Sequence, residues 1–468
     1  MSTRITDKIK SDKILCEIIS NFDNEIYLVG GSVRDYFMNI QSHDRDLIVV
    51  DEPAKEFSLK VSNVLNATFV PLDEENKIYR LVMPNKIDYI DITNPMEDSL
   101  EKDLLRRDLT INAIAANLRS GEIVDLSGGI SDINNKIINL ISDENFVDDP
   151  LRMLRAYRFQ ATYGFNISID TTKSIIEHLE LIRKPSVERI NYEILKLFGG
   201  KYSDKALESM NISGILDKIF PFVTDLKKVP PNSHHHLDLL SHSIETVKQL
   251  QFLYEKSSDE VKTHMEECDF GGHSRLAHLK FAAFMHDIGK FSTWTIEDSG
   301  RHRFIKHDDV GAKLAKDFLK KMHFSNKQIE YISKMIKFHI YPSSVMCSED
   351  ISEKALMRYL RKMELDSLDE ILLAKADRLS ARGPEITDSI VDKNINSLSL
   401  LSDFCINAQK TLTPLPKLLS GDDVMQILNI SPSRELGTIM TELHELQISG
   451  EITTKEHAIN FVKKYMKQ

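Results

Sequence analysis

The chain has 468 residues, of which 41% are apolar and 28% are charged. At roughly 100–200 residues per domain, this length predicts about three or four structural units. No apolar run approaches the roughly 18–20 residues that a membrane-spanning helix needs, which excludes an integral membrane protein. The charged start of the chain lacks an apolar segment, so no secretory signal is expected.

The charge balance is acidic, with 60 basic and 71 acidic residues and a net charge of −11. This balance argues against nucleic-acid binding through bulk charge, although a local basic stripe on an acidic body remains compatible with it. The four cysteines are scattered, and no pair has the spacing of a metal or redox motif. This pattern is typical of a protein of the reducing cytoplasm.

The first 125 residues alternate between helical and strand-like patterns. An amphipathic run at 8–22 predicts a helix, and short apolar runs at 26–29 and 44–50 predict strands. Further strand-like runs lie at 67–72, 79–84 and 86–93. We therefore expect a small mixed α+β domain.

The rest of the chain is helical in pattern. Amphipathic segments fill residues 148–198, and a histidine-rich helical stretch with almost no convincing strand covers about 200–400. The proline-containing segment 410–421 predicts a linker, and Thr453 and Glu456 have capping-box spacing at a helix start in the tail. The predicted fold class is α+β: a mixed-sheet head (1–128), an all-α neck (129–200), a helical body (201–400) and a helical tail (401–468).

The first candidate site begins at a glycine turn. Gly30 and Gly31 end an apolar strand, and Arg34 follows three residues later. Paired glycines let backbone N–H groups approach a phosphate closely, and an arginine can clamp phosphate oxygens. A plain tight turn is the alternative interpretation.

Two carboxylates follow in the sequence Asp44-Arg45-Asp46, at the start of a strand. Residues i and i+2 of a strand project from one face, so both carboxylates would lie together. Mg²⁺ prefers oxygen ligands of this kind, although a solvated strand start is also common. Asp91 is the better candidate for a third carboxylate, with Asp88 as the alternative. A phosphate-binding turn beside paired carboxylates is typical of metal-dependent nucleotidyl transfer.

The segment 104–115 carries a further arginine. Arg107 and Asp108 are predicted to lead a helix on which Asn112 shares a face with Asp108. Arg107 is a candidate triphosphate ligand, and the other two residues would maintain its local geometry. A surface Arg–Asp pair is the alternative.

A helix predicted from Asp149-Pro150 onward carries three arginines at a spacing of three. Each step of three rotates by about 300°, so Arg152, Arg155 and Arg158 cover only about 120° of the helix surface. No acidic residue lies between Asp149 and Asp170. We interpret this helix as an electropositive face directed at phosphates or a base.

Asp149 and Arg152 have complementary hydrogen-bonding roles, because a carboxylate accepts and a guanidinium donates. Cytosine and adenine both present an amino donor beside a ring-nitrogen acceptor, whereas uracil and guanine present the opposite order. The pair could therefore select C and A without a nucleic-acid template. An N-cap aspartate with an incidental ion pair is the alternative.

These motifs closely resemble those of the class II tRNA nucleotidyltransferases, the family of CCA-adding enzymes. The matching segments, in family order, are LVGGSVRD, DRD, RRDLTINAIA, DLSGGISDI, DDPLRMLRAYRF and VERINYEILKL. The tail also looks like the C-terminal region of bacterial members. The resemblance implies a head, neck, body and tail, with Mg²⁺ as cofactor and with CTP, ATP and tRNA as partners.

Residue by residue, the resemblance implies two sets of positions in the head and neck. Asp44 and Asp46 match magnesium ligands, and the matched nucleotide-contacting positions are Gly31, Arg34, Arg107, Asp149, Arg152, Arg155 and Arg158. One departure concerns the segment NPMEDSLEKDLL, which is shorter than the flexible segment that many CCA-adding members carry there. The family links that segment to the switch from C to A, so addition of CC, of A or of the whole CCA all stay open.

A second candidate site lies in the histidine-rich stretch, which resembles an HD phosphohydrolase domain. Neutral imidazoles and carboxylates on packed helices can bind divalent metals and activate water. The family pattern of histidines and aspartates is matched by His242, His286, Asp287 and Asp377, with His307 and His339 as further ligands if a second metal binds. The identity of this metal stays open. The resemblance implies hydrolysis of cyclic or terminal phosphates.

The sequence thus predicts a cytoplasmic enzyme that builds or repairs the 3′-terminal CCA of tRNA. A poly(A) polymerase of the same superfamily is one alternative, although residues 421–468 contain only five Lys or Arg against seven Asp or Glu, and such polymerases tend to have a strongly basic extension. An HD phosphohydrolase with a nucleotide-binding regulatory head is the other alternative. The oligomeric state is not predicted.

Overall fold

The fold is described from a computed structural model that covers residues 2–233, 236–268, 270–347, 351–409, 416–448 and 450–465. The chain divides into two compact units, Met1–Val223 and Thr224–Gln468. Among the described residues, none of the helices combines the length and apolar character that crossing a bilayer would require.

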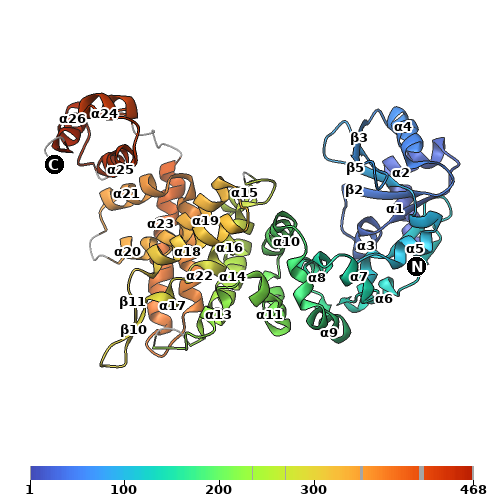
Figure 1. Cartoon of the computed structure of the whole chain (residues 1–468), viewed down its shortest axis with the longest axis horizontal. Coiled ribbons are helices and arrows are strands. Elements are labelled where there is room, and N and C mark those ends of the chain that lie inside the picture. The colour runs from blue at the N-terminus through green and yellow to red at the C-terminus, as the bar shows by residue number, and fades with distance from the viewer. Residues whose placement is uncertain are drawn as a thin grey trace. The chain divides into compact units, whose positions relative to one another are not determined.

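A seven-stranded mixed sheet organises the first part of unit 1 (Figure 1). Its strand order is β3-β4-β5-β2-β1-β6-β7, and β2 and β5 form its parallel pair while the other neighbours are antiparallel. The strands predicted at 26–29, 44–50, 67–72, 79–84 and 86–93 all form. The strand bounds are β1 Ile26–Val29, β2 Asp44–Val49, β3 Thr68–Asp73, β4 Ile78–Val82, β5 Tyr89–Thr93, β6 Ile114–Asn117 and β7 Ile123–Asp125.

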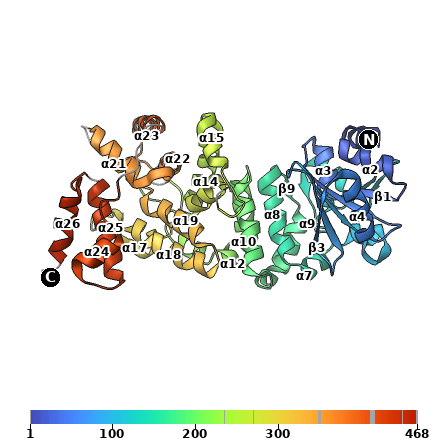
Figure 2. The same cartoon turned by 90° about the horizontal axis from the view of Figure 1, so that it is seen from above.

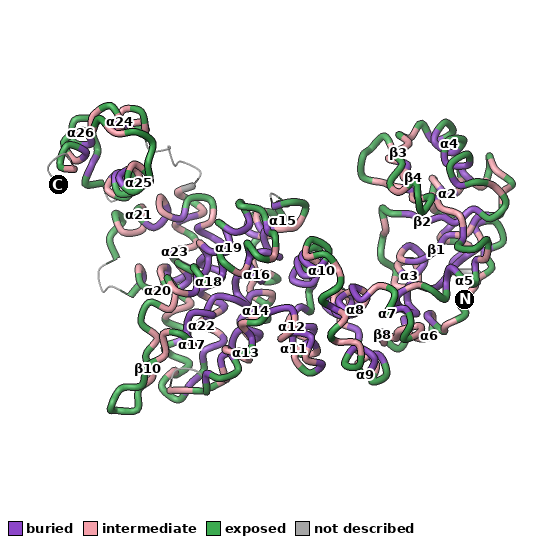
Figure 3. Tube along the Cα trace, in the orientation of Figure 1, coloured by how far each residue is buried: buried purple, intermediate pink, exposed green. Residues whose placement is uncertain are grey.

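The apolar run that follows the paired aspartates forms the centre of this sheet. Leu47, Ile48 and Val49 are fully buried, and α4 packs on the sheet through Phe57 and Val61. Figure 3 shows the same contrast between buried central strands and exposed loops. The helices of this part are α1 Ser2–Ser11, α2 Lys13–Asn21, α3 Gly31–Met38, α4 Ala54–Leu65, α5 Leu100–Leu105 and α6 Gly129–Asn135.

The single helix predicted at 8–22 is in fact two helices. Asp12 separates them, because its Oδ1 accepts hydrogen bonds from the backbone N–H groups of Ile14 and Leu15 and so starts α2. An aspartate favours such an N-cap over a place inside a helix.

The helix predicted to follow Arg107 was wrong. The chain makes a short 3₁₀ turn at Thr110–Asn112 and then enters β6. Asp108 accepts hydrogen bonds from the N–H of Leu109 and from the side chain of Asn112, and these local bonds compete with helical ones.

The predicted arginine helix forms as α8, Leu151–Tyr163, directly after Pro150. It packs along α10, Val187–Gly199, which buries an apolar face against it. The other elements are α7 Glu144–Asp148, α9 Ile169–Glu177, α11 Ser203–Ser213, α12 Ile215–Ile219, and the short parallel pair β8 Ile137–Ile138 and β9 Asn166–Ile167.

Unit 2 is almost entirely helical (Figure 2). Its core lies between α14, α16, α19 and α22. It also contains an antiparallel hairpin of β10 and β11, which the sequence did not predict, just as it did not predict β6 to β9 in unit 1. The bounds are α13 Val223–Leu226, α14 Leu239–Lys256, α15 Asp259–Glu266, α16 Arg275–Met285, α17 Lys290–Thr293, β10 Trp294–Ile296, β11 His302–Phe304, α18 His307–Lys321, α19 Asn326–Phe338, α20 Tyr341–Val345, α21 Glu353–Met363, α22 Ser367–Ser380 and α23 Asp388–Gln409.

The tail contains α24 Gly421–Leu428, α25 Arg434–Ile448 and α26 Lys455–Lys464, which share a small apolar core. The helix cap predicted at Thr453 is one residue off, because the hydroxyl of Thr454 accepts the hydrogen bond from the N–H of His457. Most of the predicted linker, at 410–415, lies outside the described residues.

Candidate nucleotide and metal sites

Three candidate carboxylates meet at the parallel pair of β2 and β5. Asp44 and Asp46 project from one face of β2, and Asp46 stands in register with Asp91 of β5. Arg80 of β4 donates to both carboxylate oxygens of Asp91, at 2.8 and 2.7 Å. Asp88, the alternative third carboxylate, instead pairs with an arginine of the opposite face.

The environment of Asp46 favours a cation. Burial raises the pKa of Asp46 to about 6, with added repulsion from Asp91 and Asp44, while Arg107 and Arg34 act in the opposite direction. The two arginines therefore do not fully compensate the negative charge of an ionised Asp46. Its oxygen donors, next to those of Asp44, fit a hard divalent cation such as Mg²⁺.

The glycine turn joins this carboxylate cluster to α3. Gly30 has φ +68 and ψ −132, a conformation open almost only to glycine, and it is the N-cap of α3. A Cβ atom there would lie 2.6 Å from Nη1 of Arg107 and 3.5 Å from Oδ2 of Asp46. The hydroxyl of Ser32 donates to the carbonyl of Asp44 and accepts from the N–H of Asp46, which fastens the turn to β2.

Two arginines line the approach to the turn. Arg34 is buried, donates to Asn112 and lies 5.1 Å from the ring centroid of Phe159. Arg107 donates twice to Asp103, at 3.2 and 3.0 Å, and its side chain stays 24% exposed. Both guanidinium groups are therefore held in place beside the carboxylates.

The arginine helix is partly neutralised by acids from other segments. Nε of Arg155 donates to the buried carboxylate of Asp108 at 2.7 Å, and this ion pair helps to lower the pKa of Asp108 against the effect of its burial. Nε of Arg158 lies 2.8 Å from Oε2 of Glu193, which α10 buries against α8. The electropositive face is thus narrower than the sequence of α8 alone predicts.

The two residues predicted to read a base are not bonded to each other. Oδ2 of Asp149 accepts a hydrogen bond from Arg189 of α10 at 2.8 Å, and Arg152 donates to the carbonyl of Asn145 at 3.2 Å. Oδ1 of Asp149 accepts from the N–H of Leu151 at 3.3 Å. Arg189 therefore fixes the orientation of the carboxylate that would accept from a base.

A cavity of about 450 Å³ collects most of these side chains in unit 1. Six arginines face three aspartates in its lining, so it is positive although the chain is acidic. The sequence did not single out Phe159 or Arg189, although Arg189 lies in the quoted motif VERINYEILKL. The lining residues are Gly31, Arg34, Asp46, Arg107, Asp108, Asn112, Asp149, Arg152, Arg155, Arg158, Phe159 and Arg189.

The second candidate site is a buried cluster in unit 2. Nε2 of His242 lies 3.3 Å from Nε2 of His286, 3.4 Å from Oδ2 of Asp287 and 3.2 Å from Oδ1 of Asp377. The structure therefore brings all four predicted ligands together. Oδ1 of Asp287 also lies 3.4 and 3.8 Å from the Nε2 atoms of His307 and His339.

The orientation of these histidines fits a metal centre. The Nδ1 atoms of His286, His307 and His339 each lie 2.7–2.8 Å from a backbone carbonyl, which leaves each Nε2 lone pair directed at the carboxylates. Asp287 is buried, with 1% of its side chain exposed, whereas the side chain of Asp377 is 27% exposed. Imidazole and carboxylate donors with one solvent-facing ligand fit a divalent metal with access for a substrate.

Three family models match the chain in order. They are the Poly A polymerase head domain at residues 26–139, the probable RNA and SrmB-binding site of polymerase A at 164–227, and the HD domain at 239–382. Both enzyme families among them, the head and the HD domain, depend on metal ions. The first match contains the carboxylates, Arg34 and Arg107 of the nucleotide site, and the third contains the four predicted metal ligands of unit 2.

Curated relatives extend over most of the chain. The A-adding tRNA nucleotidyltransferase of Deinococcus radiodurans is 29% identical, over 94% of this chain and 95% of the relative. The CC-adding tRNA nucleotidyltransferase of Thermus thermophilus is also 29% identical, over 94% and 93%. The multifunctional CCA protein of Haemophilus influenzae is 31% identical, over 68% of this chain and 75% of the relative.

The fold is shared with solved structures. The Thermotoga maritima CCA-adding enzyme complexed with tRNA superposes with a TM-score of 0.59 at 19% identity, over 99% of this chain and 98% of that one. The family models, the relatives and the fold agree with the motif order. This chain belongs to the tRNA nucleotidyltransferase family of CCA-, CC- and A-adding enzymes.

Proposed function

We propose that unit 1 transfers CMP and AMP from CTP and ATP to the 3′ end of tRNA, building or repairing all or part of the terminal CCA. The observation that carries this proposal is the single cavity in which Asp46, the arginines of α3 and α8, and Asp149 face one another. Carboxylates for a metal, donors for a triphosphate and a donor–acceptor pair for a base all lie within reach of one nucleotide.

In the proposed reaction, the 3′-hydroxyl oxygen of the RNA attacks the α-phosphorus of the nucleotide and pyrophosphate leaves. Asp44 and Asp46 would hold the Mg²⁺, which when bound would supply Lewis-acid chemistry to that hydroxyl and to the triphosphate. Arg34 and Arg107 bind the triphosphate through charge-assisted hydrogen bonds. Asp91, fixed by Arg80, completes the acidic cluster beside the metal.

Base selection falls to Asp149, which precedes α8, and to Arg152 of α8. We assign the accepting role to Asp149, held by Arg189, and the donating role to Arg152, while Arg155 and Arg158 position the nucleotide. Cytosine and adenine satisfy that order and uracil and guanine do not. The tRNA is bound in addition by the tail, and the reaction takes place in the cytoplasm.

The test uses tRNA transcripts that end before the CCA and after CC, with CTP and ATP separately and together. Products resolved to single nucleotides identify addition of CC, of A or of CCA. The variant with Asp44→Asn and Asp46→Asn should add nothing while keeping its circular dichroism spectrum, and retained incorporation would refute the assignment. Long homopolymer tails with ATP alone would identify a poly(A) polymerase instead.

We further propose that unit 2 is a metal-dependent phosphohydrolase acting on cyclic or terminal phosphates of RNA ends. Its support is a pair of overlapping ligand clusters, in which His242, His286 and Asp377 form one group and His286, Asp287 and His339 form the other, with the side chain of Asp377 27% exposed. A transcript ending in a 2′,3′-cyclic phosphate, incubated with Mn²⁺, Ni²⁺ or Mg²⁺, tests this activity. Hydrolysis without any nucleotide addition would favour a regulatory head, and no hydrolysis with any metal would refute the phosphohydrolase.

A further inference from the structure

Arg45 separates the two metal-candidate carboxylates along β2. Because neighbouring strand residues project from opposite faces, its side chain leaves the sheet on the face away from Asp44 and Asp46. The arginine is only 8% exposed. Burying an arginine costs free energy unless its N–H groups are hydrogen-bonded. The partners of Arg45 therefore show what this buried side chain holds together.

The guanidinium of Arg45 joins three parts of the head. Nε donates to Oδ2 of Asp12 at 2.8 Å, and Nη1 donates to Oδ1 of Asp88 at 2.9 Å and to the carbonyl of His43 at 3.3 Å. Asp12 also accepts from the hydroxyl of Tyr36 in α3, at 3.1 Å. One side chain of the catalytic strand thus binds the start of α2 and the chain entering β5.

These partners are themselves immobilised. Oδ1 of Asp12 caps α2, and Asp88 accepts from Asn85 at 2.6 Å and contacts Nδ1 of His43 at 3.2 Å. Asp88 directly precedes β5, the strand that carries Asp91 and pairs in parallel with β2. The Arg45 bridge therefore adds a side-chain link between β2 and the start of β5 at the level of the carboxylates.

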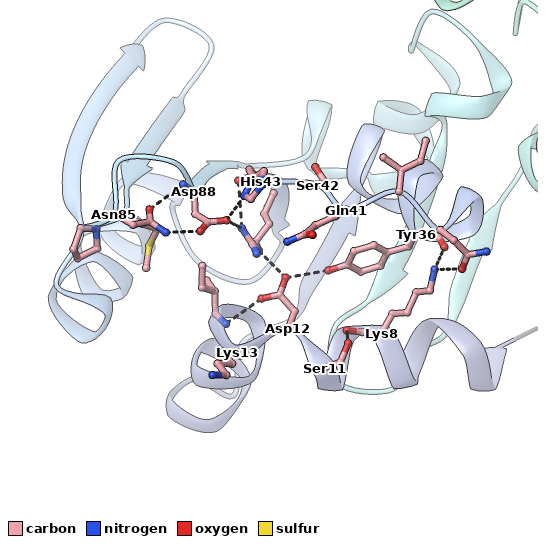
Figure 4. Close-up of a pocket in the computed structure, with 16 residues that line it drawn as sticks. Lys8, Ser11, Asp12, Lys13, Tyr36, Gln41, Ser42, His43, Asn85 and Asp88 are labelled. Carbon is pink, nitrogen blue, oxygen red and sulfur yellow. Dashed lines mark hydrogen bonds and ion pairs between the residues drawn. The ribbon is translucent and has the colours of Figure 1, made fainter. Parts of the chain in front are cut away.

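A second cavity of about 850 Å³ opens beside this bridge, and it is lined by Asp12, Tyr36, His43, Arg45 and Asp88 among others (Figure 4). Figure 4 shows Asp12 between Tyr36 and the network around Asp88 and His43. Water in such a cavity can solvate the two aspartates if the arginine is removed. A substitution at this position should therefore loosen the strand without unfolding the head.

We propose that Arg45 is a positioning residue that sets the geometry of the metal-binding carboxylates from the opposite face of the sheet. This inference rests on the proposed nucleotidyl transfer at Asp44 and Asp46. Groups that orient metal ligands from behind commonly change metal affinity or activity by about 10–100-fold when they are removed. Removing Arg45 should therefore change the dependence of activity on Mg²⁺ concentration and leave nucleotide binding unchanged.

The variants are Arg45→Met, which keeps the aliphatic volume, and Arg45→Lys, which keeps one charge. We expect Arg45→Met to raise the Mg²⁺ concentration for half-maximal CMP incorporation by about tenfold, with an unchanged KM for CTP at saturating Mg²⁺. Arg45→Lys should recover part of the loss. A lower Tm with wild-type Mg²⁺ dependence would overturn the inference, because the bridge would then be only structural.

Arg119→Gln is the matched control. Nη2 of Arg119 donates to the carbonyls of Ile19 and Phe22 and to Asp23, so it attaches the other end of α2 without touching β2. This variant should keep the wild-type Mg²⁺ dependence. An equal shift in Arg119→Gln would assign the effect to α2 as a whole and overturn a specific role for Arg45.

A binding measurement separates this inference from the proposed function. Mn²⁺ is titrated by electron paramagnetic resonance into the full chain, and the amount bound by the Asp44→Asn, Asp46→Asn variant is subtracted to remove the unit 2 site. Arg45→Met should weaken the remaining Mn²⁺ binding, and unchanged binding would overturn the inference. Wild-type protein that binds Mn²⁺ there but adds no nucleotide would refute the proposed function alone.

Discussion

The turn at Gly30 offers a sharp test of how the two halves of the nucleotide cavity depend on each other. Gly30→Ala would place a Cβ atom 2.6 Å from Nη1 of Arg107. Carbon and nitrogen atoms that are not bonded prefer separations of at least about 3.5 Å, so the guanidinium must move by about 1 Å or more. The movement would break its alignment with Asp103 and with the cavity.

The expected magnitude has two parts. The backbone at φ +68 and ψ −132 is nearly closed to alanine, which costs about 1–3 kcal/mol of stability. Losing one charge-assisted hydrogen bond to a triphosphate costs about 1.5–3 kcal/mol of binding, which corresponds to roughly 10–150-fold in kcat/KM for CTP.

The assay is steady-state CMP incorporation together with thermal unfolding. Gly214→Ala is the matched control, because Gly214 also has a positive φ, +80, but an added Cβ would meet only Leu179, at an ordinary 3.6 Å. The control should lose stability and keep kcat/KM. If Gly30→Ala kept wild-type kcat/KM, Arg107 would have no part in nucleotide binding and the reasoning would be refuted.

The same substitution should change the pH dependence. The positive charge of Arg107 lowers the pKa of Asp46, which burial otherwise raises to about 6. Displacing Arg107 should therefore raise the pKa of Asp46 further. At subsaturating Mg²⁺, where protons compete with the metal, activity should fall at a higher pH in the variant as the solution is acidified.

Three further predictions concern base selection, the unit 2 metal and the support of α8. Exchanging Asp149 and Arg152 reverses donor and acceptor, so incorporation should shift toward UTP or GTP; a retained CTP and ATP preference would contradict base reading by this pair. His286→Ala removes a ligand that contacts both aspartates, so metal content measured by mass spectrometry should drop while CMP incorporation stays normal. Glu193→Gln leaves the partly buried Arg158 without its counter-charge and should destabilise unit 1 by about 1–3 kcal/mol in chemical denaturation, whereas an unchanged midpoint would show that the ion pair adds nothing.

Local patterns were enough to predict β1 to β5 and the arginine helix. Strand alternation predicted that Asp44 and Asp46 share a face, and the spacing of three predicted that Arg152, Arg155 and Arg158 share another. These predictions succeed because each depends only on the side-chain repeat within a single strand or a single helix. Local reasoning failed after Arg107, where side-chain bonds of Asp108 replaced a helix by a turn.

The pairings between distant segments were decided by tertiary structure. Arg189 comes to Asp149 from α10, and the acids that neutralise Arg155 and Arg158 come from residues 108 and 193. The sequence of α8 shows no acid, so it overstated the free positive charge. Burial also changes the charge of the site, because it raises the pKa of Asp46 and so disfavours its ionised form. A bound cation would favour the ionised form again.

The amino-acid sequence by itself determined which chemical groups this protein presents, in which order, and on which face of each strand or helix. Only the tertiary structure decided which charged side chains remain available to a ligand and which form ion pairs with one another. The reason is physical: side-chain direction follows from the local backbone, whereas ion pairing and burial depend on packing between segments that are far apart in the chain.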